Sequence, residues 1–231
     1  MEELIKLFKC IKIVKMIKKI ITNIKSILLK RSVKVIVWDF DGTLYKSKRL
    51  IEAYEKEYFD YTKSKSNNKS LTIAEFRKLV RDHGSWMNAS SFVTNIRDIE
   101  IANYVDRRVK KANYIKHNKG MVNLICNIKN CQHVILSNAS KKDIIDGLKK
   151  IGFTKSKDGF LPFKAILSRE NHVKKPKIFS FKQVQKITKL PPQKHLMIGD
   201  SIREDIEPAK KIGFQALHID EAEIILQKWT R

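Results

Sequence analysis

Two aspartates, Asp39 and Asp41, stand two positions apart where an apolar stretch of the chain, residues 33–39, comes to an end. The stretch is short and rich in β-branched residues, which is typical of a buried strand in a parallel sheet. A carboxylate at the end of such a strand can attack phosphorus and form a covalent intermediate, which divides one difficult reaction into two easier ones. Asp39 is therefore the candidate nucleophile, and Asp41 is expected near the same edge because side chains two residues apart share a face.

Further polar side chains follow other predicted strands at the point where each strand ends. Ser137 closes residues 133–137, and Asp200 comes two residues after 195–198. In open parallel sheets, ligands bind at the carboxyl ends of the strands. We therefore expect Asp39, Ser137 and Asp200 to bring phosphate-binding and metal-binding groups to one edge of the sheet.

The elements that must position these residues alternate along the chain. The expected strands are residues 33–39, 133–137, 163–167, 195–198 and 215–219, and the expected helices between them are residues 141–151, 179–190 and 202–212. This alternation predicts an α/β fold, a doubly wound parallel sheet with right-handed crossovers. The catalytic core is expected to comprise residues 32–45 and 117–231.

A long insertion, residues 46–116, separates the first two predicted strands. It is too long for a simple crossover connection. Its apolar pattern predicts helices near residues 47–65, 71–82 and 90–116. We expect it to form a small helical cap domain that closes over the catalytic edge.

The run Asp39-Phe-Asp41-Gly-Thr-Leu resembles the signature of the haloacid dehalogenase (HAD) superfamily. Later motifs of that family follow in the same order: Leu-Ser137-Asn138 resembles the second, Lys175-Pro the third, and Gly-Asp200-Ser with Asp205 the fourth. The resemblance covers about residues 33–220, and the insertion lies where subfamily I of this superfamily places its helical C1 cap. It implies a Rossmann-like core of the HAD type.

The chemistry that the resemblance implies is a Mg²⁺-dependent phosphatase reaction through an aspartyl-phosphate on Asp39. Asp41 would protonate the leaving alcohol and then activate water, and its presence favours phosphoester chemistry because dehalogenases of the family lack this second aspartate. Mg²⁺ takes hard oxygen ligands, which Asp39, Asp200 and the backbone carbonyl of Asp41 would provide. Asp205 would act as an outer ligand or through water, and the neighbouring Glu204 competes for that role.

The resemblance also implies donors that hold the phosphoryl oxygens by hydrogen bonds and by charge. The implied phosphate-binding residues are Thr43, Ser137, Asn138 and Lys175. Position 178 is Ile, where the family often has a second proline. Lys174 and Lys177 therefore remain open as alternatives to Lys175.

The chain begins with a basic segment, residues 1–31, in which lysines and apolar residues interleave without a run long enough to span a bilayer. The segment predicts an amphipathic helix that binds an anionic membrane surface or associates with another copy of itself; Glu2 and Glu3 disfavour a mitochondrial presequence. The whole chain has 48 Lys and Arg against 24 Asp and Glu, a formal charge of +24. That charge attracts anions, although compositional drift is the plain alternative.

Three cysteines, Cys10, Cys126 and Cys131, form no C-x-x-C pair. Their odd number and spacing disfavour a disulfide framework and a zinc site. This usage predicts a reducing compartment, so a cytoplasmic location is expected, with peripheral membrane association as an option.

The leading functional interpretation is a phosphatase acting on a small phosphorylated metabolite such as a sugar phosphate, phosphoglycolate or a nucleotide. A phosphomutase of the β-phosphoglucomutase type would use the same residues. A polynucleotide end phosphatase agrees with the basic charge, but nucleic acid is not favoured because the chain has no distinct basic and aromatic binding module. A membrane-recruited or self-assembling scaffold is the non-enzymatic alternative, which the complete set of motifs disfavours.

Overall fold

The computed structural model describes Thr22, Ser26 and residues 29–67, 69–156, 159–160, 162–171 and 178–230. Most of the predicted helix over residues 1–31 lies outside the described residues, as do the candidate lysines Lys174, Lys175 and Lys177. The chain divides into two compact units. One is Met1–Tyr45 with His117–Arg231, and the other is Lys46–Lys116.

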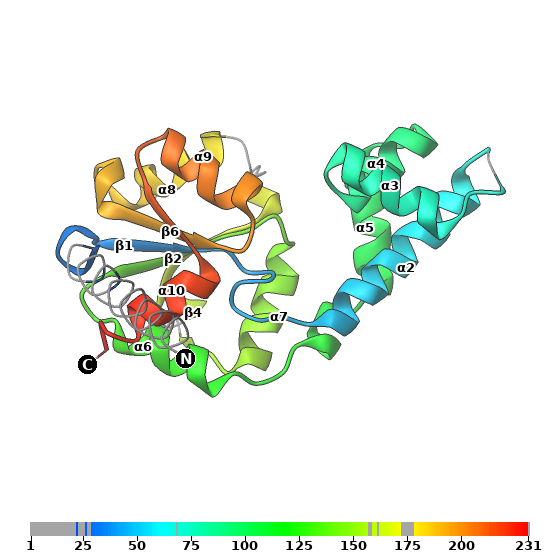
Figure 1. Ribbon diagram of the computed structural model, residues 1–231. Helices are drawn as coiled ribbons and strands as arrows, with labels where there is room; N and C mark the ends of the chain where they lie inside the picture. Colours follow the sequence, from blue (N-terminus) through cyan, green and yellow to red (C-terminus); the bar gives the residue numbers. More distant parts are fainter. Residues whose placement is uncertain are drawn as a thin grey trace, which may run out of the picture. The chain divides into compact units, whose positions relative to one another are not determined.

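The first unit is built on a seven-stranded sheet with the order β3-β4-β5-β2-β1-β6-β7 (Figure 1). Its strands are β1 (Val35–Trp38), β2 (Gln132–Leu136), β3 (Lys155–Ser156), β4 (Gly159–Phe160), β5 (Phe163–Leu167), β6 (His195–Gly199) and β7 (Gln215–His218). The five strands from β5 to β7 run parallel, as the alternating pattern predicts. The antiparallel pair β3 and β4 was not predicted, because two residues a strand are too few to show a period.

Helices cover both faces of this sheet. They are α6 (Lys119–Asn127), α7 (Lys141–Ile151), α8 (Ile178–Thr188), α9 (Glu207–Lys211) and α10 (Ile219–Leu226). Figure 1 shows α8 and α9 on one face and α6, α7 and α10 on the other. All four residues of β1 are fully buried, which is why its sequence is continuously apolar and does not alternate.

Packing on the α8 and α9 face joins side chains from every layer. Val37 of β1 and Met197 of β6 lie in one buried cluster with Phe181 of α8 and Ala209 of α9. Phe181 and the adjacent Phe214 meet edge to face, with ring centroids 6.0 Å apart. This packing holds the strands in place relative to one another. It therefore also sets the positions of the residues that follow each strand.

The second unit is helical and comprises α2 (Lys48–Lys65), α3 (Ile73–His83), α4 (Trp86–Thr94), α5 (Asp98–Arg108) and the short 3₁₀ helix η1 (Lys111–Tyr114). The single helix expected over residues 90–116 was wrong. Asn95 takes the left-handed conformation, with φ of 57°, and its N–H closes the end of α4 on the carbonyl of Ser91. Asparagine tolerates this conformation better than most residues, so it ends a helix there.

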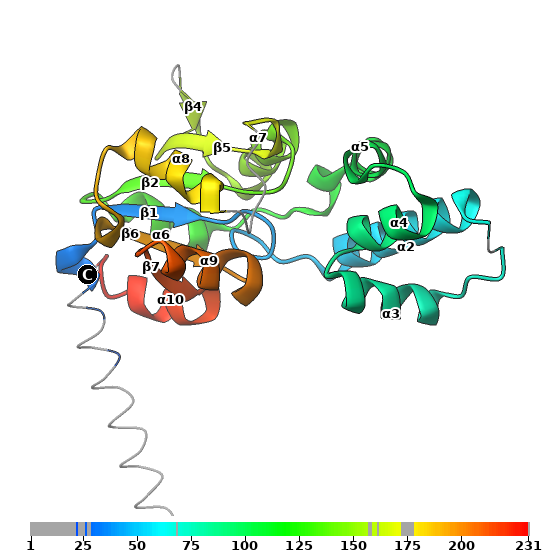
Figure 2. The same cartoon turned by 90° about the horizontal axis from the view of Figure 1, so that it is seen from above.

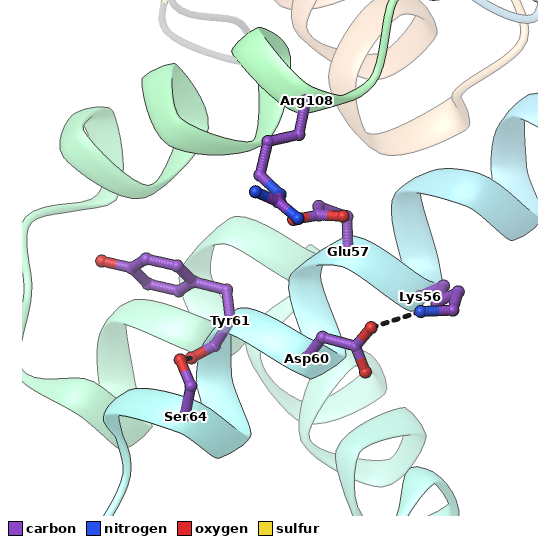
Figure 3. A network of polar contacts seen from close by, with 6 residues as sticks. All are labelled: Lys56, Glu57, Asp60, Tyr61, Ser64 and Arg108. Carbon is purple, nitrogen blue, oxygen red and sulfur yellow. Dashed lines mark hydrogen bonds and ion pairs between the residues drawn. The ribbon is translucent and has the colours of Figure 1, made fainter.

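Several side chains of α2 form polar contacts, one of them with α5 (Figure 3). Arg108 of α5 pairs with Glu57, and Lys56 pairs with Asp60 at 2.5 Å. Ion pairs that water reaches contribute little to stability. The fully buried side chains of Phe76, Ile101 and Val105 stabilise this unit through the apolar surface that they remove from water. Among the described residues of both units, no helix is long and apolar enough to cross a membrane.

Two buried histidines stand near the beginning of the strands on either side of β1. His133 of β2 accepts a hydrogen bond on Nδ1 from Trp38 Nε1 at 3.0 Å, so its Nε2 donates to the carbonyl of Ile128 at 3.0 Å. His195 of β6 is completely buried and lies 2.7 Å from the hydroxyl of Thr188. Burial lowers the pKa of both imidazoles below the ordinary value of 6.5.

The free energy of unfolding is therefore expected to fall as the pH decreases below about 6.5. The unfolded chain accepts protons at these histidines that the folded chain resists, so acid favours unfolding by up to about 1.4 kcal/mol per pH unit for each group. Urea unfolding at about pH 7.5 and about pH 5.5 measures the loss. His195→Gln should reduce it, whereas His117→Gln, at an exposed site, should not; an unchanged loss in His195→Gln would contradict the assignment.

Candidate functional site

Asp39 follows β1 directly, and its backbone continues the pairing of that strand. Its N–H donates to the carbonyl of Ile198 at 2.9 Å, which fixes the residue at the carboxyl edge of the sheet. The side chain is only 5% exposed, and the Thr43 hydroxyl donates to its Oδ2 at 3.2 Å. The carboxylate is thus oriented before any ligand arrives, as a nucleophile must be.

Three carboxylates from two chain segments meet at this edge. Asp39, Asp200 and Asp205 each offer one oxygen, and these oxygens lie within 4.8 Å of one another. Like charges this close repel, so a cation among them is favourable. Carboxylate oxygens are also the ligands that hard divalent cations take. The three carboxylates of Asp39, Asp200 and Asp205, which we name the acidic group, therefore fit Mg²⁺.

Two glycines let the carboxylates approach the backbone. Gly42 has a φ of +75°, and a Cβ there would lie 2.1 Å from Asp200 Oδ2. A Cβ at Gly199 would lie 2.2 Å from Asp205 Oδ2. Contacts below 3.0 Å are not sustained by real side chains, so both positions require glycine to keep the acidic group in place.

A π-helical turn, η4 (Ile202–Ile206), determines that Asp205 and not its neighbour Glu204 lies in the acidic group. The Ile206 N–H reaches the carbonyl of Ser201 five residues back, at 3.2 Å, so the turn is wider than an α-helical one. Asp205 is thereby turned inward, 1% exposed, with its Oδ2 accepting from the Ser201 N–H at 3.2 Å. Glu204 instead accepts from the Asn138 side chain at 3.1 Å. The helix predicted over residues 202–212 thus begins as this π turn and continues as α9.

Asp41 lies outside the acidic group and is held by a different partner. The Tyr45 hydroxyl donates to Asp41 Oδ1. Tyr45 is itself buried, with its ring edge against Phe40 at a centroid distance of 5.2 Å. A turn closed by the Leu44 N–H on the Phe40 carbonyl brings the two residues together. Sequence reasoning missed this role of Tyr45, although its four-residue spacing from Asp41 was visible.

The second predicted strand end contributes Ser137. This residue is 1% exposed, its N–H donates to the Leu167 carbonyl at 3.0 Å, and its Oγ accepts from the Ala139 N–H at 3.2 Å. No described residue accepts the Ser137 hydroxyl hydrogen, which can therefore be donated to a ligand. Thr43, by contrast, directs its hydroxyl to Asp39. Lys175 lies outside the described residues.

His218, at the end of β7, is a further residue that sequence reasoning did not single out. Its Nε2 donates to the backbone carbonyl of Asp200 at 3.0 Å. This bond supports the exposed Asp200 from the strand next to its own, so His218 positions a member of the acidic group. Its place at a strand end was the available signal.

Solved structures with a similar fold have little sequence in common with this chain. CbbY of Rhodobacter sphaeroides, in complex with xylulose-(1,5)-bisphosphate, is 15% identical; the match covers 80% of this chain and 85% of that one, with a TM-score of 0.58. YfnB of Bacillus subtilis, bound to magnesium, is 17% identical over 80% and 85%, with a TM-score of 0.52. A HAD family enzyme of Bacteroides thetaiotaomicron, in complex with magnesium and inorganic phosphate, is 19% identical over 80% and 93%, with a TM-score of 0.50.

These similarities show a shared fold, and no curated protein matches the chain. The model of one protein family, described as haloacid dehalogenase-like hydrolase, matches residues 36–219. That interval contains the five parallel strands apart from the first residue of β1, the helical unit and the acidic group at the carboxyl edge. The chain belongs to the haloacid dehalogenase-like hydrolase family.

Proposed function

We propose that the protein is a Mg²⁺-dependent phosphatase that hydrolyses a small phosphate monoester through an aspartyl-phosphate on Asp39. The observation that carries this proposal is the meeting of the Asp39, Asp200 and Asp205 oxygens within 4.8 Å at the carboxyl edge. A nucleophilic carboxylate beside a cation site is the arrangement that attack on an anionic phosphate requires.

Asp39, Asp200, Asp205 and the Asp41 backbone carbonyl would hold the metal. Bound Mg²⁺ supplies the positive charge that offsets the repulsion between a carboxylate and a phosphate. The Gly42 and Gly199 positions support this assignment, because both leave room for a carboxylate against the backbone.

Side chains of this chain carry out both half-reactions. In the first, an Asp39 oxygen bonds to phosphorus as the ester oxygen leaves, and Asp41 gives that oxygen a proton. In the second, Asp41 takes a proton from the water that attacks the aspartyl-phosphate, so carboxylate and phosphate are released. Tyr45 directs Asp41, and Ser137 with Lys175 would donate to the phosphoryl oxygens.

Two relatives of the same fold support a phosphate-bearing substrate. The Bacteroides thetaiotaomicron enzyme was solved with magnesium and inorganic phosphate, and CbbY with a sugar bisphosphate. For the present chain, the second aspartate Asp41 adds to this support, since phosphoester chemistry needs an acid for the leaving alcohol.

The direct test is hydrolysis of an aryl phosphate with Mg²⁺ and with excess EDTA. Turnover that needs Mg²⁺ is expected, and a folded preparation that shows no turnover with any divalent metal would refute the proposal. A panel of sugar phosphates, nucleotides and 5′- or 3′-phosphorylated oligonucleotides then identifies the substrate class. Transfer of phosphate to a sugar hydroxyl instead of water would identify a mutase.

The different surroundings of Asp205 and Glu204 lead to a test of the proposed metal site. Asp205→Asn is expected to weaken Mg²⁺ binding by about 10- to 100-fold, the usual loss when a supporting ligand of a metal is removed. Glu204→Gln is the matched control, since it removes the same charge one residue away and keeps a carbonyl oxygen for Asn138. Calorimetric titration with MgCl₂ measures both; equal losses would show that only the local charge matters.

A further inference from the structure

A concave site lies at the opposite edge of the sheet from Asp39. A cavity of about 460 Å³ is lined by four cationic residues, Lys30, Arg31, Lys34 and Lys129, together with Trp229 and other side chains. We name it the basal pocket. Lys34 immediately precedes β1 and residues 129–131 precede β2, so the basal pocket lies at the amino ends of strands whose carboxyl ends carry Asp39 and Ser137.

Three chain segments far apart in the sequence build the pocket. Figure 2 shows the C-terminal end of the chain beside the segment that leads into β1. Trp229 is 6% exposed, and its Nε1 donates to the carbonyl of Ser26 at 3.1 Å, while its own carbonyl accepts from Lys30 Nζ at 3.0 Å. The Gln132 N–H donates to the Lys34 carbonyl at 2.8 Å. The backbone under the cations is therefore fixed before any ligand binds.

No described residue compensates the charge of the pocket. The described residues that line it include no carboxylate, and none of the four cations forms an ion pair with another described residue. Cys131, which also lines it, adds no negative charge, because burial raises the pKa of its thiol to about 11. Four like charges around one cavity repel one another, so an anion that enters relieves the repulsion as well as gaining contacts.

We propose that the basal pocket binds a phosphate-bearing anion that carries at least two negative charges. The volume is in the range of small-molecule sites. The Arg31 guanidinium offers paired donors to a phosphate and the lysines offer point charges. The phosphate can belong to a soluble organic diphosphate or to a phosphorylated lipid headgroup. The proposal is independent of the phosphatase activity, because none of the residues at the carboxyl edge takes part in it.

Calorimetric titration of the full chain with pyrophosphate tests the proposal. Excess EDTA excludes metal-mediated binding at the acidic group, and chloride matched in ionic strength excludes general screening. We expect Lys34→Gln with Lys129→Gln to weaken binding by about tenfold or more, since two charge-assisted contacts are lost. Both side chains are exposed, so the double variant should fold.

The control double variant is Lys182→Gln with Lys186→Gln, which removes the same charge from the exposed surface of α8. Co-sedimentation with phosphatidylcholine vesicles, with and without a phosphatidylinositol phosphate, distinguishes the two sources of phosphate. Vesicle binding that the pocket variant alone loses assigns a lipid headgroup, and loss of pyrophosphate binding alone assigns a soluble ligand. If the pocket variant and the control behave alike with both probes, the proposal is overturned.

Discussion

Asp39→Asn is expected to lower the turnover of an aryl phosphate by at least about 10³-fold, because an amide cannot form the covalent intermediate that a carboxylate forms. Asparagine has the same size, and its oxygen can still accept the Thr43 hydrogen bond. The loss would therefore report the missing nucleophile and not a missing fold. Steady-state kinetics at saturating Mg²⁺ measures it.

The same variant is also expected to gain thermal stability when no metal is bound. In EDTA, Asp39→Asn should raise the melting temperature, because it removes one of three carboxylates whose oxygens lie within 4.8 Å of one another. Asp60→Asn is the matched control on the exposed surface of α2, where the carboxylate is paired with Lys56 and does not belong to the group of three. Residual turnover above about 1% of wild type in Asp39→Asn would mean that another group is the nucleophile.

The parallel sheet was predictable from sequence because its strands are buried on both faces. Such strands appear as short apolar runs with clear ends, and β5 and α7 have the bounds that the pattern predicts. In α7, Ser140 accepts from the N–H of Asp143 at the start, and Gly152 takes a left-handed conformation after the end. Local signals and tertiary packing agree there, which is the condition for a reliable prediction.

The sequence predicted which residues would meet at the carboxyl edge better than it predicted their geometry. Strand ends placed Asp39, Ser137 and Asp200 at one edge, since all three follow parallel strands. The motif favoured Asp205 and left Glu204 open as a competitor, because a turn of π geometry rotates side chains away from the positions that an α-helical period predicts. Tyr45 and Asp41 meet through a tight turn, which periodicity does not describe.

Gly42→Ala is expected to have the second largest effect, although it changes no functional group. Its Cβ would lie 2.1 Å from Asp200 Oδ2, and the φ of +75° is unfavourable for alanine. Asp200 must then leave the acidic group or the turn after Asp39 must open. We expect turnover and Mg²⁺ affinity to fall by at least about 100-fold, with a loss of about 1–2 kcal/mol in the free energy of unfolding.

Gly120→Ala is the control that isolates this effect. Gly120 lies in α6, its φ is ordinary, and a Cβ there would meet only Asn118 Oδ1, at 3.5 Å. Alanine at this second residue of the helix should stabilise the chain by up to about 1 kcal/mol, because it restricts the unfolded chain, and should leave turnover unchanged. The same methyl group thus stabilises at one glycine and disables at the other. Full activity in Gly42→Ala would show that Asp200 does not need its place against the backbone, and the metal site assigned to the three carboxylates would then be wrong.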